Sequence, residues 1–121
     1  MRDLEEARTF YVDVLGCTAG RERDGWIDVW FYGLQLTLQE RPEEVLPEEQ
    51  RGVRHFGVAL HRQELDALVA RLDDAGVRWL SPLRTDDPGT EREQTKAKLL
   101  DPSGNAIELK SYADPSAAYA P

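Results

Sequence analysis

Residues 99–109 read LLDPSGNAIEL, and this stretch decides the fold because it places a tight turn between two strand-like segments. The turn Asp101-Pro102-Ser103-Gly104-Asn105 has suitable chemistry, since proline presets φ and glycine accepts a positive φ. The flanking segments Thr95–Leu100 and Ala106–Tyr112 are rich in apolar residues, which predicts a strand on each side. The sequence therefore predicts a strand-turn-strand unit near the end of the chain.

The segments before this unit predict a strand, a helix and another strand. Val53–Leu60 is strand-like, and Val77–Leu80 is a short strand. Between them lies a helical apolar stripe that Gly76 closes, formed by Leu65, Leu68, Val69 and Leu72. Ser81–Glu93 holds two prolines and a glycine, so we expect a long exposed loop there.

The first half of the chain repeats this plan in shortened form. A helix opens at Asp3, whose side chain can cap it with Glu6 in a capping-box arrangement, and ends at Gly16. Trp26–Tyr32 and Leu34–Gln39 predict two strands. The first copy starts at its helix, with no room for an opening strand.

We therefore expect an α+β fold of tandem β-α-β-β-β modules that form a cup-shaped mixed sheet with helices outside. Residues 1–41 are expected to form the first module, which lacks its opening strand. Residues 42–52 are a polar, acidic linker, residues 53–112 the complete second module, and residues 113–121 a loose tail.

Composition limits the partners. The formal net charge is −8, and no local cluster of Lys and Arg offsets it, so nucleic acid is not an expected partner. There is no apolar run long enough to span a membrane and no apolar leader, so we expect no membrane association and a cytoplasmic location.

Strand parity brings two chemically useful residues together. If the apolar sets of the last module pack on its helix, His55 and Glu108 both point to the other face of the sheet. An imidazole and a carboxylate on neighbouring strands are suitable ligands for a divalent metal. By residue type alone, a structural histidine or a His–Glu ion pair explains the same pattern.

Three segments resemble the vicinal oxygen chelate superfamily, which includes glyoxalase I, bleomycin-resistance proteins and extradiol dioxygenases. These are residues 3–16 (DLEEARTFYVDVLG), residues 54–58 (RHFGV) and residues 100–109 (LDPSGNAIEL). The resemblance implies metal ligands on the first and last strands of each module. His55 and Glu108 match the second module's ligand positions.

The first module departs from the family pattern. Thr37 stands where the resemblance implies an acidic ligand, and Gln35 and Gln39 share its face as amide alternatives. Trp30 and Tyr32 could form an aromatic wall for an organic ligand, with core packing as the alternative. No catalytic residue is assigned.

The resemblance implies two functions. The first is a glyoxalase- or dioxygenase-like enzyme that uses Fe, Mn, Zn or Ni on a small substrate chelating the metal through vicinal oxygens. The alternative is a metal-free protein that sequesters a small molecule, as in the bleomycin-resistance branch. Two explanations of the missing strand compete: either the natural chain starts earlier and carries it, or the short chain is the real protein and a partner subunit or nothing fills the gap. An unpaired sheet edge there favours a homodimer.

Overall fold

The computed structural model describes residues 1–119 as two units. Unit 1 comprises residues 1–54 together with the turn at 101–105, and unit 2 comprises residues 55–100 with the segment from 106 onward. The end of the expected loose tail, residues 120–121, lies outside the described residues. In residues 1–119 no helix has the length and apolar character needed to cross a bilayer.

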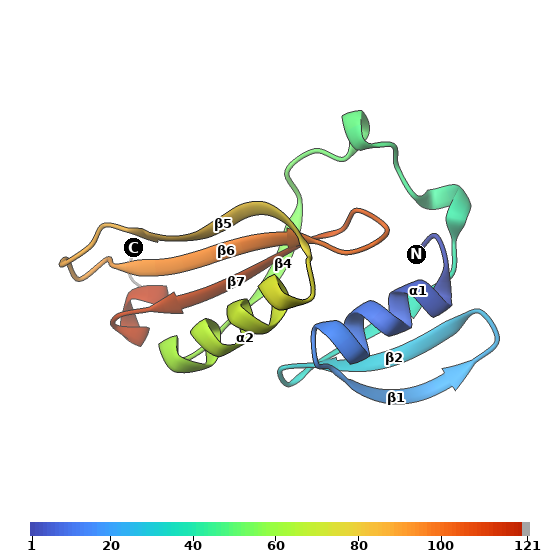
Figure 1. Ribbon diagram of the computed structural model, residues 1–121, viewed down its shortest axis with the longest axis horizontal. Coiled ribbons are helices and arrows are strands. Elements are labelled where there is room, and N and C mark those ends of the chain that lie inside the picture. The colour runs from blue at the N-terminus through green and yellow to red at the C-terminus, as the bar shows by residue number, and fades with distance from the viewer. Residues whose placement is uncertain (120–121) are drawn as a thin grey trace. The chain divides into compact units, whose positions relative to one another are not determined.

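Unit 1 is a short helix packed on a three-stranded antiparallel sheet (Figure 1). Its elements are α1 (Leu4–Arg8), a π-helical continuation (Thr9–Val14), β1 (Thr18–Arg23), β2 (Trp26–Phe31) and β3 (Leu34–Gln39). The helix starts where expected, because Asp3 accepts a hydrogen bond from the Glu6 amide. The core of the unit includes Ala7, Tyr11, Leu15, Ile27, Val29 and Phe31.

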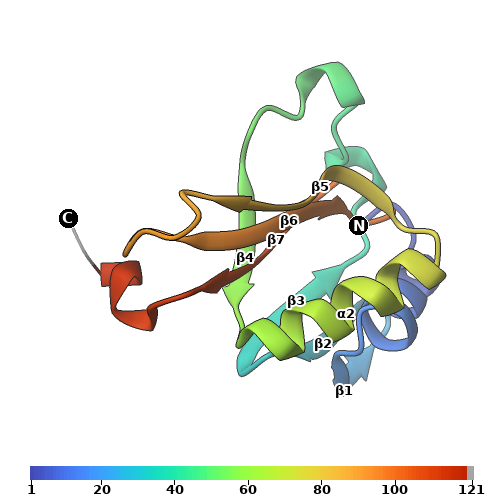
Figure 2. The same ribbon diagram turned by 60° about the vertical axis from the view of Figure 1, so that its left-hand side comes forward.

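Unit 2 has the predicted strand-helix-strand-strand-strand order. Its elements are β4 (His55–Ala59), α2 (Arg62–Asp74), β5 (Arg78–Asp86), β6 (Gln94–Leu100) and β7 (Ala106–Tyr112). The sheet order is β4-β7-β6-β5, with β4 parallel to β7 and the other pairs antiparallel. Figure 2 shows α2 running along this sheet. Short 3-10 helices occupy Pro42–Glu44, Glu48–Gln50 and Pro115–Tyr119.

The predicted α+β class is thus confirmed, but two local expectations are wrong and one strand was not predicted. Thr18–Arg23 forms β1. This strand has no apolar alternation from which it could be predicted, because every residue in it is polar or small and exposed. Ser81–Asp86 is strand rather than loop, since Pro82 lies in β5 at the edge of its sheet, where a missing N–H is tolerated. Tyr32 lies in a turn with φ 48° beside Gly33, so β2 ends at Phe31.

The two units share a feature at the edge of each sheet. The Met1 amino group donates to the Gln39 carbonyl at 2.6 Å, and the Arg41 amide donates to the Met1 carbonyl at 2.8 Å. In unit 2 the Leu60 amide donates to the Lys110 carbonyl at 2.7 Å, just beyond the β4–β7 parallel pair. Met1 therefore takes the place of Leu60. Counting two residues back from Gln39 and Lys110 aligns Thr37 with Glu108.

Candidate functional site

The face of the unit 2 sheet opposite α2 carries the charged side chains of β6 and β7. In β6 and β7, buried and half-buried residues alternate along each strand. The buried set packs beneath α2 and consists of Thr95, Ala97, Leu99, Ile107, Leu109 and Ser111. The half-buried set includes Lys96, Lys98, Glu108 and Lys110, and we call their side the open face of unit 2.

His55 and Glu108 meet on the open face. The parallel ladder pairs His55 with Ala106 and Gly57 with Glu108, which places the two side chains on adjacent strands. His55 Nε2 lies 3.9 Å from Glu108 Oε2. The imidazole is 36% exposed and the carboxylate only 13% exposed, so the pair is accessible from solvent mainly through His55.

Two lysines hold the same carboxylate. Lys110 Nζ lies 2.9 Å from Oε1 of Glu108, and Lys98 Nζ lies 3.4 Å from Oε2. Burial by itself raises the pKa of Glu108, but the hydrogen bond and charge of Lys110, together with Lys98, outweigh it and lower the pKa. Glu108 is therefore ionised at neutral pH.

The donor types on the open face fit a divalent metal. An imidazole nitrogen and an ionised carboxylate oxygen are ligands used for Fe, Mn, Zn and Ni, and they already lie close together. Within the described part of the chain, no group of three His, Cys, Asp or Glu side chains is placed to hold a metal ion. A dication at His55 and Glu108 must displace the ammonium groups of Lys98 and Lys110.

A second carboxylate lies farther along the same sheet. Asp86 Oδ2 is 2.7 Å from Lys96 Nζ, and Asp86 Oδ1 is 3.3 Å from Arg84 Nε. The hydrogen bond from Lys96 is the main cause that lowers the pKa of Asp86. Neither Asp86 nor Arg84 was predicted as a site residue, because both lie in the segment expected to be a loop.

The predicted ligand-binding residues of the first module lie in unit 1. Trp30 pairs with Gln35 across β2 and β3, Thr37 with Asp28, and Gln39 with Trp26. Trp30 is 48% exposed, so it is not a core residue of its unit. Tyr32 does not share the strand face of Trp30, because it occupies the β2–β3 turn.

Asp28 is a buried acidic residue beside Thr37 that was not predicted from the sequence. It is buried, and its carboxylate accepts a 2.6 Å hydrogen bond from the Thr37 hydroxyl and lies 3.3 Å from Arg21. The hydrogen bond from Thr37 is the leading cause that lowers the pKa of Asp28. The sequence did hold a sign of this position, because Asp28 alternates with Trp26 and Trp30 and so lies on the same face of the strand. The Thr37 hydroxyl therefore donates its hydrogen bond to Asp28.

The DPSGN turn has a structural role. Asp101 accepts hydrogen bonds from the Ser103 amide, the Asn105 amide and the Asn105 side chain, all at 2.8–2.9 Å. The buried Tyr11 hydroxyl also donates to Asp101 at 2.9 Å. Gly104 takes φ 87°, as the turn requires. This part of the family-like sequence therefore supports the fold rather than the chemistry.

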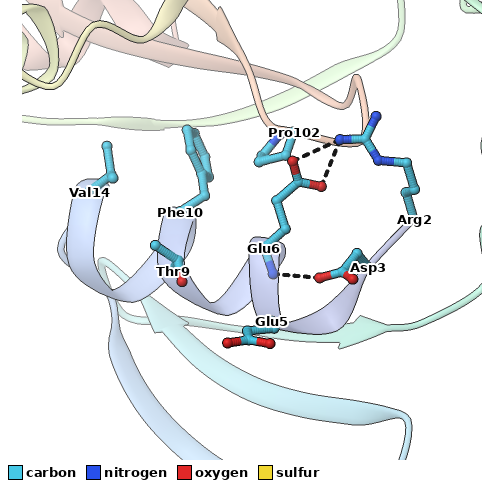
Figure 3. Close-up of a pocket in the computed structure, with 8 residues that line it drawn as sticks. All are labelled: Arg2, Asp3, Glu5, Glu6, Thr9, Phe10, Val14 and Pro102. Atoms are coloured by element: carbon cyan, nitrogen blue, oxygen red, sulfur yellow. Dashed lines mark hydrogen bonds and ion pairs between the residues drawn. The ribbon is translucent and has the colours of Figure 1, made fainter.

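A solvent-open hollow of about 810 Å³ lies along α1 in unit 1. Phe10, Val14 and Pro102 supply apolar surface, and an ion pair of 2.7 Å joins Arg2 to Glu6 at its end (Figure 3). None of the ligand-binding residues predicted from the sequence lines it.

Comparison with known proteins adds independent information. The family model described as "Glyoxalase/Bleomycin resistance protein/Dioxygenase superfamily" matches residues 1–109. A catechol-2,3-dioxygenase of Bacillus subtilis (strain 168) is 33% identical over 119 residues; the match covers 94% of this chain but only 39% of that protein.

Solved structures show the same likeness. A glyoxalase/bleomycin resistance protein/dioxygenase from Alicyclobacillus acidocaldarius is 32% identical, with a TM-score of 0.88 over 98% of this chain and 90% of that chain. The fosfomycin resistance protein FosX from Listeria monocytogenes shares the fold at 15% identity, with a TM-score of 0.79 over 97% of this chain and 90% of that chain.

Proposed function

Because the chain belongs to the Glyoxalase/Bleomycin resistance protein/Dioxygenase superfamily, we propose that it acts on a small organic molecule with a divalent metal held by His55 and Glu108. The observation that supports this most strongly is the 3.9 Å approach of an imidazole nitrogen to an ionised carboxylate on adjacent strands. The chain spans 39% of the Bacillus dioxygenase it matches, so that protein's reaction is a hypothesis for this chain.

The side chains of the open face would have distinct roles. A bound metal would supply Lewis-acid polarisation of a substrate oxygen. Glu108 offers a carboxylate that is ionised without further proton loss, and His55 offers the more exposed ligand. Lys98 and Lys110 would move from Glu108 toward the substrate's developing or fixed negative charge.

Metal reconstitution tests this proposal. The protein would be loaded separately with Fe(II), Mn(II), Zn(II) and Ni(II) and dialysed, and the metal bound per chain measured. We expect stoichiometric binding of at least one metal by the wild type and its loss in His55→Ala and Glu108→Gln. His61→Asn is the matched control, because it removes the chain's other imidazole from the start of α2 while keeping a capping side chain. No stoichiometric metal in the wild type would exclude the proposal.

A metal-free sequestering protein is the second function to weigh. The specific observation in its favour is that Lys98 and Lys110 already neutralise Glu108, so the carboxylate needs no metal to be stable. In that case the same experiment shows no bound metal, and an organic ligand quenches the fluorescence of the half-exposed Trp30.

We also propose that the chain forms a homodimer. In the part of the chain that the structure describes, β3 is paired with β2 only, and on its other edge Met1 donates a hydrogen bond to Gln39, the last residue of β3. Unpaired backbone groups at a sheet edge favour pairing with another chain. Light scattering on the purified protein tests this, and a monomeric mass would contradict it. The cytoplasmic location stays a prediction.

A further inference from the structure

We propose that the open face of unit 2 binds the oxyanion group of a small organic molecule, a carboxylate, phosphate or phosphonate, through a row of cations. The row consists of Arg84, Lys96 and Lys110, with Lys98 beside it. This inference deepens the proposed function by naming the chemical class of its ligand, and its test needs no metal.

The sheet register aligns the cations. Arg84 on β5 is paired with Lys96 on β6, and Lys96 is paired with Lys110 on β7. Three cations thus occupy successive positions of one cross-strand row. Like charges directly opposite each other destabilise a sheet, so this row costs stability unless nearby negative charge offsets it. A bound anion between the cations would remove the repulsion.

The neighbouring carboxylates neutralise the cations only in part. Asp86 is shared by Arg84 and Lys96, and Glu108 is shared by Lys98 and Lys110. Each carboxylate therefore faces two cations, and the cluster keeps excess positive charge.

The ammonium groups are positioned to bind strongly. The side chains of Lys96, Lys98 and Lys110 are only 18–29% exposed, so water screens their charges less than it does at a free surface. Lys110 Nζ also lies 5.6 Å from the centre of the Tyr112 ring, which offers an apolar surface beside the cation.

The charge of the whole chain limits the size of the ligand. The formal net charge is −8, so a long polyanion is repelled by the rest of the molecule. A small anion interacts mainly with charges within about 10 Å, the screening length at moderate salt. The cluster therefore suits one or two anionic groups on a small molecule rather than nucleic acid.

Titration of the metal-free protein tests the proposal. Amide chemical shifts would be followed by NMR while inorganic phosphate, malonate and benzoate are added separately, with sodium chloride adjusted to constant ionic strength. We expect at least one anion to cause saturable shifts in β6 and β7 in the millimolar range. The comparison among the three anions separates phosphoryl from carboxylate preference.

Variants identify the cations responsible. Lys96→Gln and Lys110→Gln should each weaken binding about tenfold, as expected for loss of one charge-assisted hydrogen bond. Lys96→Arg should keep binding, and Arg92→Gln, in the exposed loop before β6, is the matched control that should bind as the wild type does. Thermal unfolding would verify that each variant is folded. Shifts that follow only total ionic strength, or equal affinity in Lys96→Gln and the wild type, would overturn the proposal.

Discussion

Replacing Gly57 by alanine should move His55 away from Glu108, because the added methyl group would push their two strands apart. Gly57 lies in β4 and is paired with Glu108 in the parallel β4–β7 ladder. A Cβ built on Gly57 would overlap the Glu108 carbonyl oxygen and lie 2.8 Å from the carbonyl carbon and 3.0 Å from the Glu108 Cβ. These are mainly backbone atoms, so a rotamer change cannot relieve the overlap. Gly57→Ala must therefore move β4 away from β7.

The expected cost follows from this geometry. Overpacking in a closely packed region typically costs about 1–3 kcal/mol. For a chain of this size, each kcal/mol corresponds to a change of about 4 °C in Tm. We therefore expect Gly57→Ala to lower Tm by about 4–12 °C. Because His55 is in the displaced strand, the variant should also lose the metal binding proposed for the wild type.

Calorimetry and the reconstitution assay check both effects. Gly20→Ala in β1 is the matched control, since it makes the same chemical change where the new Cβ would lie 3.2 Å from the nearest atom, the Asp28 carbonyl oxygen. We expect this control to shift Tm by less than about 4 °C. A Gly57→Ala protein that unfolds within about 1 °C of the wild type would refute the argument.

Three further predictions concern single contacts. Tyr11→Phe removes the buried hydrogen bond to Asp101 and should lower the free energy of unfolding by about 1–3 kcal/mol in denaturant titration; an unchanged midpoint would contradict this. Glu108 has a pKa below its ordinary value of 4.5, so the stabilisation from its charge is complete above that pH and disappears as the pH falls through the lower, folded-state pKa. The stability difference between the wild type and Glu108→Gln should accordingly be constant near neutrality and shrink below about pH 4.5, whereas a constant difference throughout would refute it. Lys98→Gln removes a competing ammonium group and should tighten metal binding about three- to tenfold by calorimetric titration, and weaker binding would count against the competition.

The sequence was most informative where its patterns are periodic. The alternation in Ala106–Tyr112 and around His55 places Glu108 and His55 opposite the buried side, and the structure puts the two side chains 3.9 Å apart. The DPSGN turn and the Asp3 cap also formed where their chemistry predicts. The turn, the cap and the face that each strand residue occupies depend on neighbouring residues, so local reasoning suffices for them. The pairing of β4 with β7, which brings His55 to Glu108, does not follow from local sequence.

What the sequence could not predict depends on contacts between distant segments. β1 has no apolar alternation, and it is a strand because β2 pairs with it. The cation row requires the register of three strands, one of which contains Pro82 in a segment that looks like a loop. The contact of Glu108 with Lys98 likewise appears only once β6 and β7 are aligned.

Anomalous diffraction from crystals soaked in Mn(II) or Zn(II) is the measurement that tests the central claim most directly. We predict an anomalous peak about 2.0–2.2 Å from both His55 Nε2 and a Glu108 carboxylate oxygen, with the ammonium groups of Lys98 and Lys110 moved away. Glu108 still held by both lysines, with no anomalous peak beside His55, would contradict it.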